Sequence, residues 1–123
     1  MREFKFRAWD KENKRMLDLI MLGENSLLPN GHELENREDF IIMQYTGLKD
    51  RNGKEINEGD IAEWVDNYGY IKETCQMIYN QQEGAFKGEY CTDGGEHRYV
   101  GMMNAEYGFR VIGNIYEDPE LLG

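Results

Sequence analysis

The chain has 123 residues, of which 40% are hydrophobic and 31% are charged, and it contains only two prolines. This composition is typical of a globular domain and excludes a disordered tail or a collagen-like polymer. Lys and Arg number 14 against 24 Asp and Glu, so the formal net charge is −10. That charge argues against broad binding to nucleic-acid phosphates.

Neither an export signal nor a membrane span is expected. Residues 1–10 alternate charged and apolar side chains, whereas a secretory signal needs a continuous apolar stretch of roughly 7–15 residues. The longest apolar stretch, residues 19–22, is far shorter than the roughly 20 residues of a membrane helix. We therefore expect a cytoplasmic protein.

Alternation of apolar and polar side chains predicts a chain made mostly of strands, because successive side chains of a strand point to opposite faces. The predicted strands are residues 3–10, 15–21, 40–46, 60–66, 70–79, 85–91 and 107–115. Short strands joined by Gly-rich turns indicate a small β-barrel or sandwich.

The first predicted strand, residues 3–10, has two different faces. Phe4, Phe6 and Ala8 share one face, which we expect to be core. The other face carries charged side chains and Trp9, and we expect it to be solvated. Trp9 then either packs under a loop or lies at an interface, and its exposure would favour the interface.

The middle and the end of the chain contain the main turn signals. Residues 23–39 lack a period and are rich in Gly, Asn and polar residues, so we interpret them as a long loop with at most one helical turn. Asn52 followed by Gly53 predicts a type I′ turn, which needs two successive positive φ angles. Asp118 can cap a short C-terminal helix that begins at Pro119.

A domain boundary is expected near the end of the long loop. Residues 1–42 are predicted to form an N-terminal β-rich subdomain. Residues 43–123 are predicted to form a β-barrel portion with a C-terminal tail, packed with the first piece as one unit.

Both cysteines fall in the predicted hairpin of residues 70–79 and 85–91. If Cys75 shares a face with Phe86, Cys91 points to the opposite face, because side chains alternate. A register slip would leave the two sulfurs too far apart for a disulfide as well. We therefore expect two free thiols.

No cofactor or metal site is predicted. Zinc sites are recognised by short spacings between ligands, and His32, His97, Cys75 and Cys91 have none. Cys91 and His97 could form a nucleophile pair, but nothing in the sequence evidently orients the imidazole. We therefore expect no catalytic residues and no enzyme.

Residues 50–54 superficially resemble a calcium loop. Such a loop needs oxygen ligands at its fifth and twelfth positions, and Lys54 and Ile61 occupy them. We therefore interpret the segment as an ordinary hairpin turn.

Two groups of acidic residues have two interpretations. They form a solvated face, or they engage a basic partner such as a host DNA-binding protein. The groups are Glu33, Glu35, Glu38 and Asp39, followed by Glu55, Glu58, Asp60, Glu63 and Asp66.

Two other sets of side chains are candidates for binding. Aromatic-rich strand faces favour a protein partner or self-association, whereas basic residues interleaved with aromatics can stack on single-stranded nucleic acid. The candidates are Trp64, Tyr68 and Tyr70 for a protein partner, and Lys5, Arg7 and Trp9 for nucleic acid.

Three segments together resemble the YopX family of phage and prophage proteins, and they occur in the family's order. They read FRAWD at 6–10 leading to Met16; MQYTGLKD at 43–50 with GKEI at 53–56 and EGDI at 58–61; and VIGNIYE at 111–117 with PELL at 119–122. The resemblance implies a small phage or prophage accessory protein with an SH3-like β-barrel over about residues 43–117. It brings no established activity and no functional residues.

The sequence as a whole predicts a mainly β protein with an SH3-like barrel, an N-terminal β-hairpin subdomain and a short C-terminal helix. The expected function is a non-enzymatic protein-interaction module in the host bacterial cytoplasm. Its partner is an unknown host or phage protein, or a second copy of the chain. Local nucleic-acid binding through the basic N-terminal hairpin is the alternative.

Overall fold

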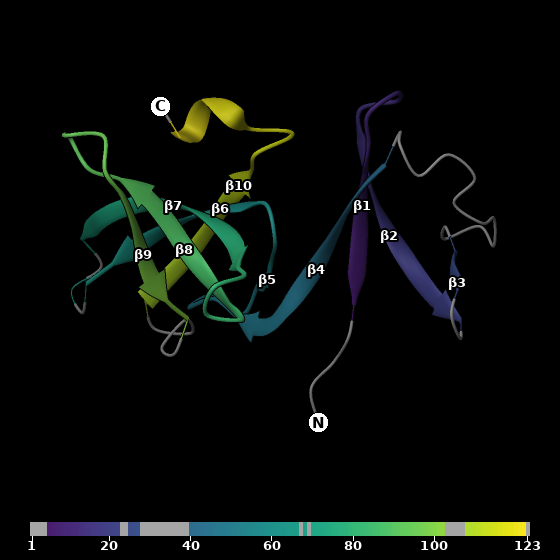
Figure 1. Ribbon diagram of the computed structural model, residues 1–123, viewed down its shortest axis with the longest axis horizontal. Helices are drawn as coiled ribbons and strands as arrows, with labels where there is room; N and C mark the ends of the chain where they lie inside the picture. Colours follow the sequence, from purple (N-terminus) through teal and green to yellow (C-terminus); the bar gives the residue numbers. More distant parts are fainter. Residues whose placement is uncertain are drawn as a thin grey trace. The chain divides into compact units, whose positions relative to one another are not determined.

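The computed structural model describes residues 5–22, 25–27, 40–66, 68, 70–102 and 108–122, with the backbone alone for 19–22 and 25–27. Strands follow one another along almost all of these residues (Figure 1). The prediction of a mainly β protein is therefore confirmed.

Internal contacts divide the chain into two units, Met1–Tyr45 and Thr46–Gly123. The division falls inside a strand, because β4 begins in the first unit and ends in the second. The first unit contains β1 (Phe6–Asp10), β2 (Arg15–Leu22), β3 (Asn25–Leu27) and the start of β4 (Phe40–Lys49).

The strands of the first unit are antiparallel, in the order β3-β2-β1-β4. Arg7 of β1 lies opposite Asp18 of β2 and Met43 of β4, so β1 is a central strand. This pairing confirms the predicted opening hairpin. β3 lies within the segment interpreted as a loop, and residues 23–24 and 28–39 of that segment are outside the described residues.

The face of the first strand that was expected to be solvated is exposed at Lys5 but largely covered further along. Arg7 is half-buried, Trp9 is only 9% exposed, and Ala8 between them is fully buried. Alternation shows which side chains share a face, but it does not show whether that face is covered. Of the expected core side chains, Phe6 is half-buried and Phe4 lies outside the described residues.

The second unit contains one five-stranded antiparallel sheet in the order β10-β6-β7-β8-β9, which curls in Figure 1. β10, the last of these strands in the chain, pairs with β6, the first of them, and the short strand β5 lies next to β4 in the other sheet. The elements are β5 (Glu55–Asn57), β6 (Asp60–Val65), β7 (Ile71–Asn80), β8 (Ala85–Cys91), β9 (His97–Gly101), β10 (Phe109–Asn114) and the 3-10 helix η2 (Pro119–Leu122).

Three details of this unit differ from the sequence predictions. β5 and β9 were not expected, because their short polar segments have no apolar alternation. The C-terminal segment forms a single 3-10 turn rather than an α-helix.

The hairpin of β7 and β8 has the predicted register, with Tyr79 directly opposite Phe86. Both cysteines are free, with Cys75 buried and Cys91 exposed. Cys75 belongs to the core, which one curled face of the sheet supplies together with β5. The core residues are Ile56, Ala62, Cys75, Met77, Met102, Phe109 and Val111.

The turn after β4 forms where expected, but its type differs. Gly53 has a φ of +81°, whereas Asn52 does not have a positive φ. The Gly53 amide donates to the Asp50 carbonyl at 3.0 Å, and the Asp50 amide donates to the Lys54 carbonyl at 2.8 Å. This is the three-residue loop that ends in a left-handed glycine, rather than a type I′ turn.

Among the residues that the structure describes, no helix is long and apolar enough to cross a membrane.

Gly113 of β10 provides a test of how closely η2 packs. A Cβ atom there would lie 2.5 Å from Asp118 Oδ2 and 2.9 Å from Leu121 Cδ1. We expect Gly113→Ala to lower the free energy of unfolding by about 1–3 kcal/mol, the usual cost of overpacking, in a urea titration.

The control is Gly94→Ala, whose Cβ would have its nearest neighbour, Thr92 Oγ1, at 3.9 Å. We expect this change to stay within about 0.5 kcal/mol of the wild type, as surface substitutions usually do. Equal stabilities of the two variants would contradict the packing of η2 against Gly113.

Candidate functional site

The six residues singled out from the sequence fall in different units. The second unit holds three of them near the turn between β6 and β7, and the first unit holds the other three on and just before β1. They are Trp64, Tyr68 and Tyr70 in the second unit, and Lys5, Arg7 and Trp9 in the first.

The turn between β6 and β7 is held by one carboxylate. Asp66 Oδ1 accepts hydrogen bonds from the Tyr68 amide at 2.9 Å and the Tyr70 amide at 3.0 Å. The Asp66 amide in turn donates to the Tyr70 carbonyl at 3.0 Å. The backbone amides of Tyr68 and Tyr70 are therefore anchored to Asp66, while their side chains are 87% and 73% exposed.

Trp64 connects this turn to the core. Its half-buried indole packs against the core cluster, with the Tyr90 ring 6.3 Å away between centroids. Lys72 Nζ lies 5.3 Å from the centre of the indole, within the range of a cation–π interaction. Truncation of Trp64 would therefore remove packing as well as surface.

We call the exposed side chains of this region, together with the half-buried Trp64, the aromatic turn surface. It consists of residues from the end of β6, the turn and the start of β7. Its members are Trp64, Tyr68, Tyr70, Ile71 and Lys72.

The basic residues of the first unit are in a different environment. Lys5 Nζ lies 5.6 Å from the centre of the Tyr45 ring, and Arg7 is half-buried. Stacking on a nucleic-acid base needs an exposed aromatic face, and the indole of Trp9 is buried. The exposure that would have favoured Trp9 as an interface residue is therefore not observed.

The second acidic group is not a solvated face. Asp60 is buried and its Oδ2 accepts the Asn57 amide at 2.8 Å. The side chain of Glu63 is mostly covered and accepts the Arg110 Nε at 2.9 Å. Asp66 holds the turn of the aromatic turn surface. These carboxylates stabilise the fold, and the first acidic group lies outside the described residues.

The segment that superficially resembles a calcium loop is also structural. Asp50 is buried, with Oδ1 accepting the amides of Asn52 and Lys54 and Oδ2 accepting the amide of Val111. Within the described ranges, no group of three or more His, Cys, Asp or Glu side chains could hold a metal ion. His32, one of the four residues considered above as zinc ligands, lies outside the described residues.

The two thiols have opposite surroundings. Burial raises the pKa of the Cys75 thiol to about 12, with a smaller contribution from the negative charge of Glu73. Cys91 is exposed on the last residue of β8 and lies directly opposite His97, the first residue of β9.

The side chain of Glu89 lies beside Cys91 and His97 and contacts the imidazole. Cys91 Sγ lies 3.6 Å from His97 Nδ1 and 4.0 Å from His97 Nε2, while Glu89 Oε1 lies 3.0 Å from His97 Nδ1. Glu89 is the imidazole-orienting group that the sequence did not reveal. It stands two residues before Cys91 on the same strand face, so it could have been found had β9 been predicted.

Asp10 allows a pH test of the carboxylates that hold turns. It accepts the side-chain amide of Asn13 at 2.9 Å and the backbone amides of Asn13 and Glu12 at 3.1 Å. The hydrogen bond from the Asn13 side chain is the largest cause that holds the pKa of the Asp10 carboxyl below its usual 3.8. The stabilisation is therefore present above pH 3.8 and is lost as pH falls through the lower folded-state value.

We expect Asp10→Asn to be less stable than the wild type at neutral pH, and the two to converge as the medium becomes acidic. The urea unfolding midpoint, measured at a series of pH values, checks this. A stability difference that stays constant down to strongly acidic pH would show that the charge of Asp10 does not hold the turn.

The chain is similar to proteins of known structure. The crystal structure of protein EF1440 from Enterococcus faecalis is similar over 100% of both chains, with 30% identity and a TM-score of 0.64. The crystal structure of protein yopX from Bacillus subtilis is similar over 97% of this chain and 98% of the yopX chain, with 20% identity and a TM-score of 0.55. No curated protein matches. The family model of the YopX protein matches residues 5–123, and the chain therefore belongs to the YopX family.

Proposed function

We propose that this protein is a non-enzymatic interaction module that binds a partner protein through the aromatic turn surface. One observation carries the proposal: Tyr68 and Tyr70 expose 87% and 73% of their surface on a turn whose backbone Asp66 holds. Side chains this large and this exposed gain most when a partner covers them.

The anchored amides of Tyr68 and Tyr70 favour binding energetically. Association costs free energy for every loop and side chain that must be ordered. The Asp66 carboxylate already holds the amides of Tyr68 and Tyr70, and a tyrosine has only two side-chain torsions to restrict. Most of the apolar area of Tyr68 and Tyr70 is therefore available as binding energy.

The absence of catalysis is part of the proposal. Asp50 and Asp60 are buried, as the carboxyl groups of general acids often are, but their oxygens accept backbone amides. A carboxylate whose oxygens are taken up by such bonds holds the backbone rather than contacting a substrate.

The resemblance to phage and prophage proteins supports the biological setting that we propose. The module acts as an accessory protein in the cytoplasm of the host bacterium, and its partner is a host or phage protein or a second copy of the chain. An SH3-like barrel in the second unit belongs to the same proposal. The return of β10 to pair with β6, which begins to close the sheet, supports it.

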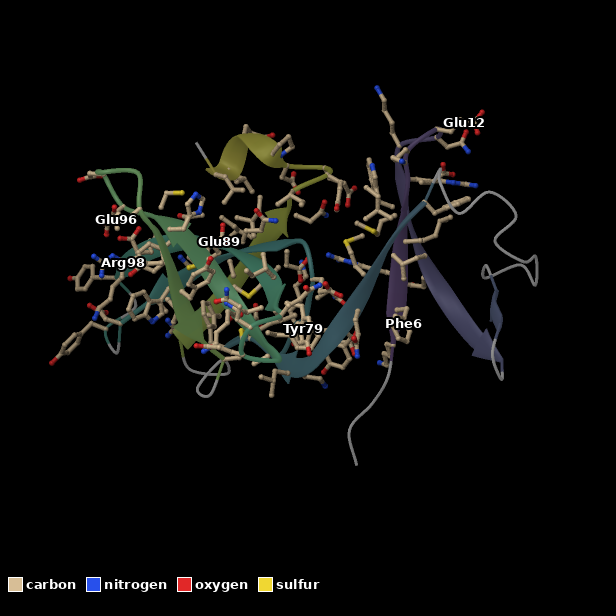
Figure 2. All side chains as sticks on the ribbon, in the orientation of Figure 1. Phe6, Glu12, Tyr79, Glu89, Glu96 and Arg98 are labelled. Atoms are coloured by element: carbon tan, nitrogen blue, oxygen red, sulfur yellow. The ribbon has the colours of Figure 1, made fainter. Side chains whose placement is uncertain are left out.

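The test compares variants of the immobilised protein in a lysate of a Gram-positive bacterium. Tyr68→Ser combined with Tyr70→Ser removes the two exposed rings and leaves the half-buried Trp64 in place. Tyr79→Ser is the matched control, because Tyr79 is also an exposed tyrosine but lies at the other end of β7 (Figure 2). Far-ultraviolet circular dichroism and urea midpoints establish that all three proteins are folded.

We expect the wild type and Tyr79→Ser to retain the same protein through a salt wash and after nuclease treatment. The double variant loses most of it, since interface tyrosines of this kind commonly contribute 2 kcal/mol or more, roughly a thirtyfold loss of affinity. Equal retention by the double variant would refute the proposed surface. Loss of every captured species after nuclease would move the function to nucleic acid and to Lys5 and Arg7.

A further inference from the structure

The exposed face at the β8–β9 end of the second unit carries a thiol, an imidazole and a carboxylate within contact distance. Cys91 and His97 are directly paired across the two strands, and Glu89 lies two residues from Cys91 on the same strand. The imidazole is 60% exposed, so small molecules in solution reach the cluster. The three side chains belong to β8 and β9, and they lie toward the same end of the sheet as the turn between β6 and β7, because the end of β8 runs antiparallel to the start of β7.

The hydrogen bond to Glu89 determines what the imidazole can do. Glu89 Oε1 accepts from His97 Nδ1 at 3.0 Å, so Nδ1 carries a hydrogen. In the neutral ring the lone pair is then on Nε2, 4.0 Å from Cys91 Sγ. Because Sγ lies nearer to Nδ1, at 3.6 Å, the exposed ring must turn to direct that lone pair at the thiol. Distances of this kind shorten when a reactant arrives. The arrangement is that of a carboxylate orienting an imidazole beside a thiol.

We propose that Cys91 is a reactive thiol site that takes small-molecule disulfides, with His97 as the proton acceptor and Glu89 as the residue that positions the imidazole. The proposal does not rest on the aromatic turn surface, and none of its three residues is a member of that surface. It makes Cys91 the position at which this protein is reversibly modified when small disulfides accumulate.

The proposed reaction is thiol–disulfide exchange. His97 Nε2 takes the proton of the Cys91 thiol, and the sulfur attacks one sulfur of the disulfide. A bond forms between Cys91 Sγ and that sulfur, the original sulfur–sulfur bond breaks, and the second sulfur leaves as a thiolate that takes up a proton. Cys91 is oxidised to a mixed disulfide, and the small disulfide supplies the oxidising equivalent.

Cys75 serves as an internal reference in the same chain. It is fully buried in the core, on the face of the sheet opposite to Cys91. Burial also raises the pKa of its thiol to about 12, so almost no thiolate forms at neutral pH. In the folded protein, one thiol is therefore expected to react and the other is not.

The test measures the rate of reaction with dithiodipyridine, an uncharged disulfide whose product absorbs light. An uncharged probe avoids repulsion from the net charge of −10. The full chain is used at neutral pH, and mass spectrometry identifies the modified residue. Arg98→Ala is the matched control, since Arg98 follows His97 on β9 and successive side chains of a strand point to opposite faces.

We expect one equivalent to react at Cys91 in the folded wild type, and Cys75 to react only after unfolding. His97→Ala slows the reaction by about tenfold and added free imidazole restores part of the rate, because the proton acceptor beside the thiol is then missing. Glu89→Gln slows it by a smaller factor, Glu89→Asp recovers part of the loss, and Arg98→Ala leaves it unchanged.

Two results would overturn the proposal. One is a His97→Ala protein that is folded and reacts at the wild-type rate. The other is reaction of Cys75 as fast as that of Cys91 in the folded chain.

Discussion

The buried carboxylate of Asp50 is the interaction on which the second unit depends. It is 3% exposed and accepts the amides of Asn52 and Lys54 at 2.9 Å and the amide of Val111 at 2.8 Å. Two of these bonds shape the turn after β4, and the third ties that turn to β10, sixty-one residues further along the chain. Without the carboxylate, three amides would lose their acceptor, and each buried one would cost about 1–3 kcal/mol.

Side-chain oxygens that accept backbone amides also hold other turns of the second unit. Asp60 holds the turn before β6, Asp66 holds the turn after it, and Asn114 accepts the amides of Tyr116 and Glu117 after β10. Carboxylates and amides that accept backbone N–H groups replace the water that would otherwise satisfy a turn. The turn that displays the exposed tyrosines is one instance, so stability and the proposed binding surface share one physical device.

Alternation was enough to predict most strands and the faces of β7 and β8, because a single apolar face leaves a clear period of two. It failed for β9, whose residues His97–Gly101 are mostly exposed and lack that period. The sequence therefore suggested Cys91 and His97 as a pair but could not place them opposite each other, and it did not reveal Glu89 as the orienting group. Alternation also could not show that Trp9 is buried, because burial depends on what covers a strand and not on the strand itself.

Hydrogen exchange of single amides in Asp50→Ala tests the central role of this carboxylate most directly. In the wild type we expect the amides of Asn52, Lys54 and Val111 to be protected. In the variant they should exchange at least about tenfold faster relative to the Gly59 amide, which donates to the Met77 carbonyl. Equal relative protection in both proteins would contradict the account, because the turn and β10 would then be held together by other contacts.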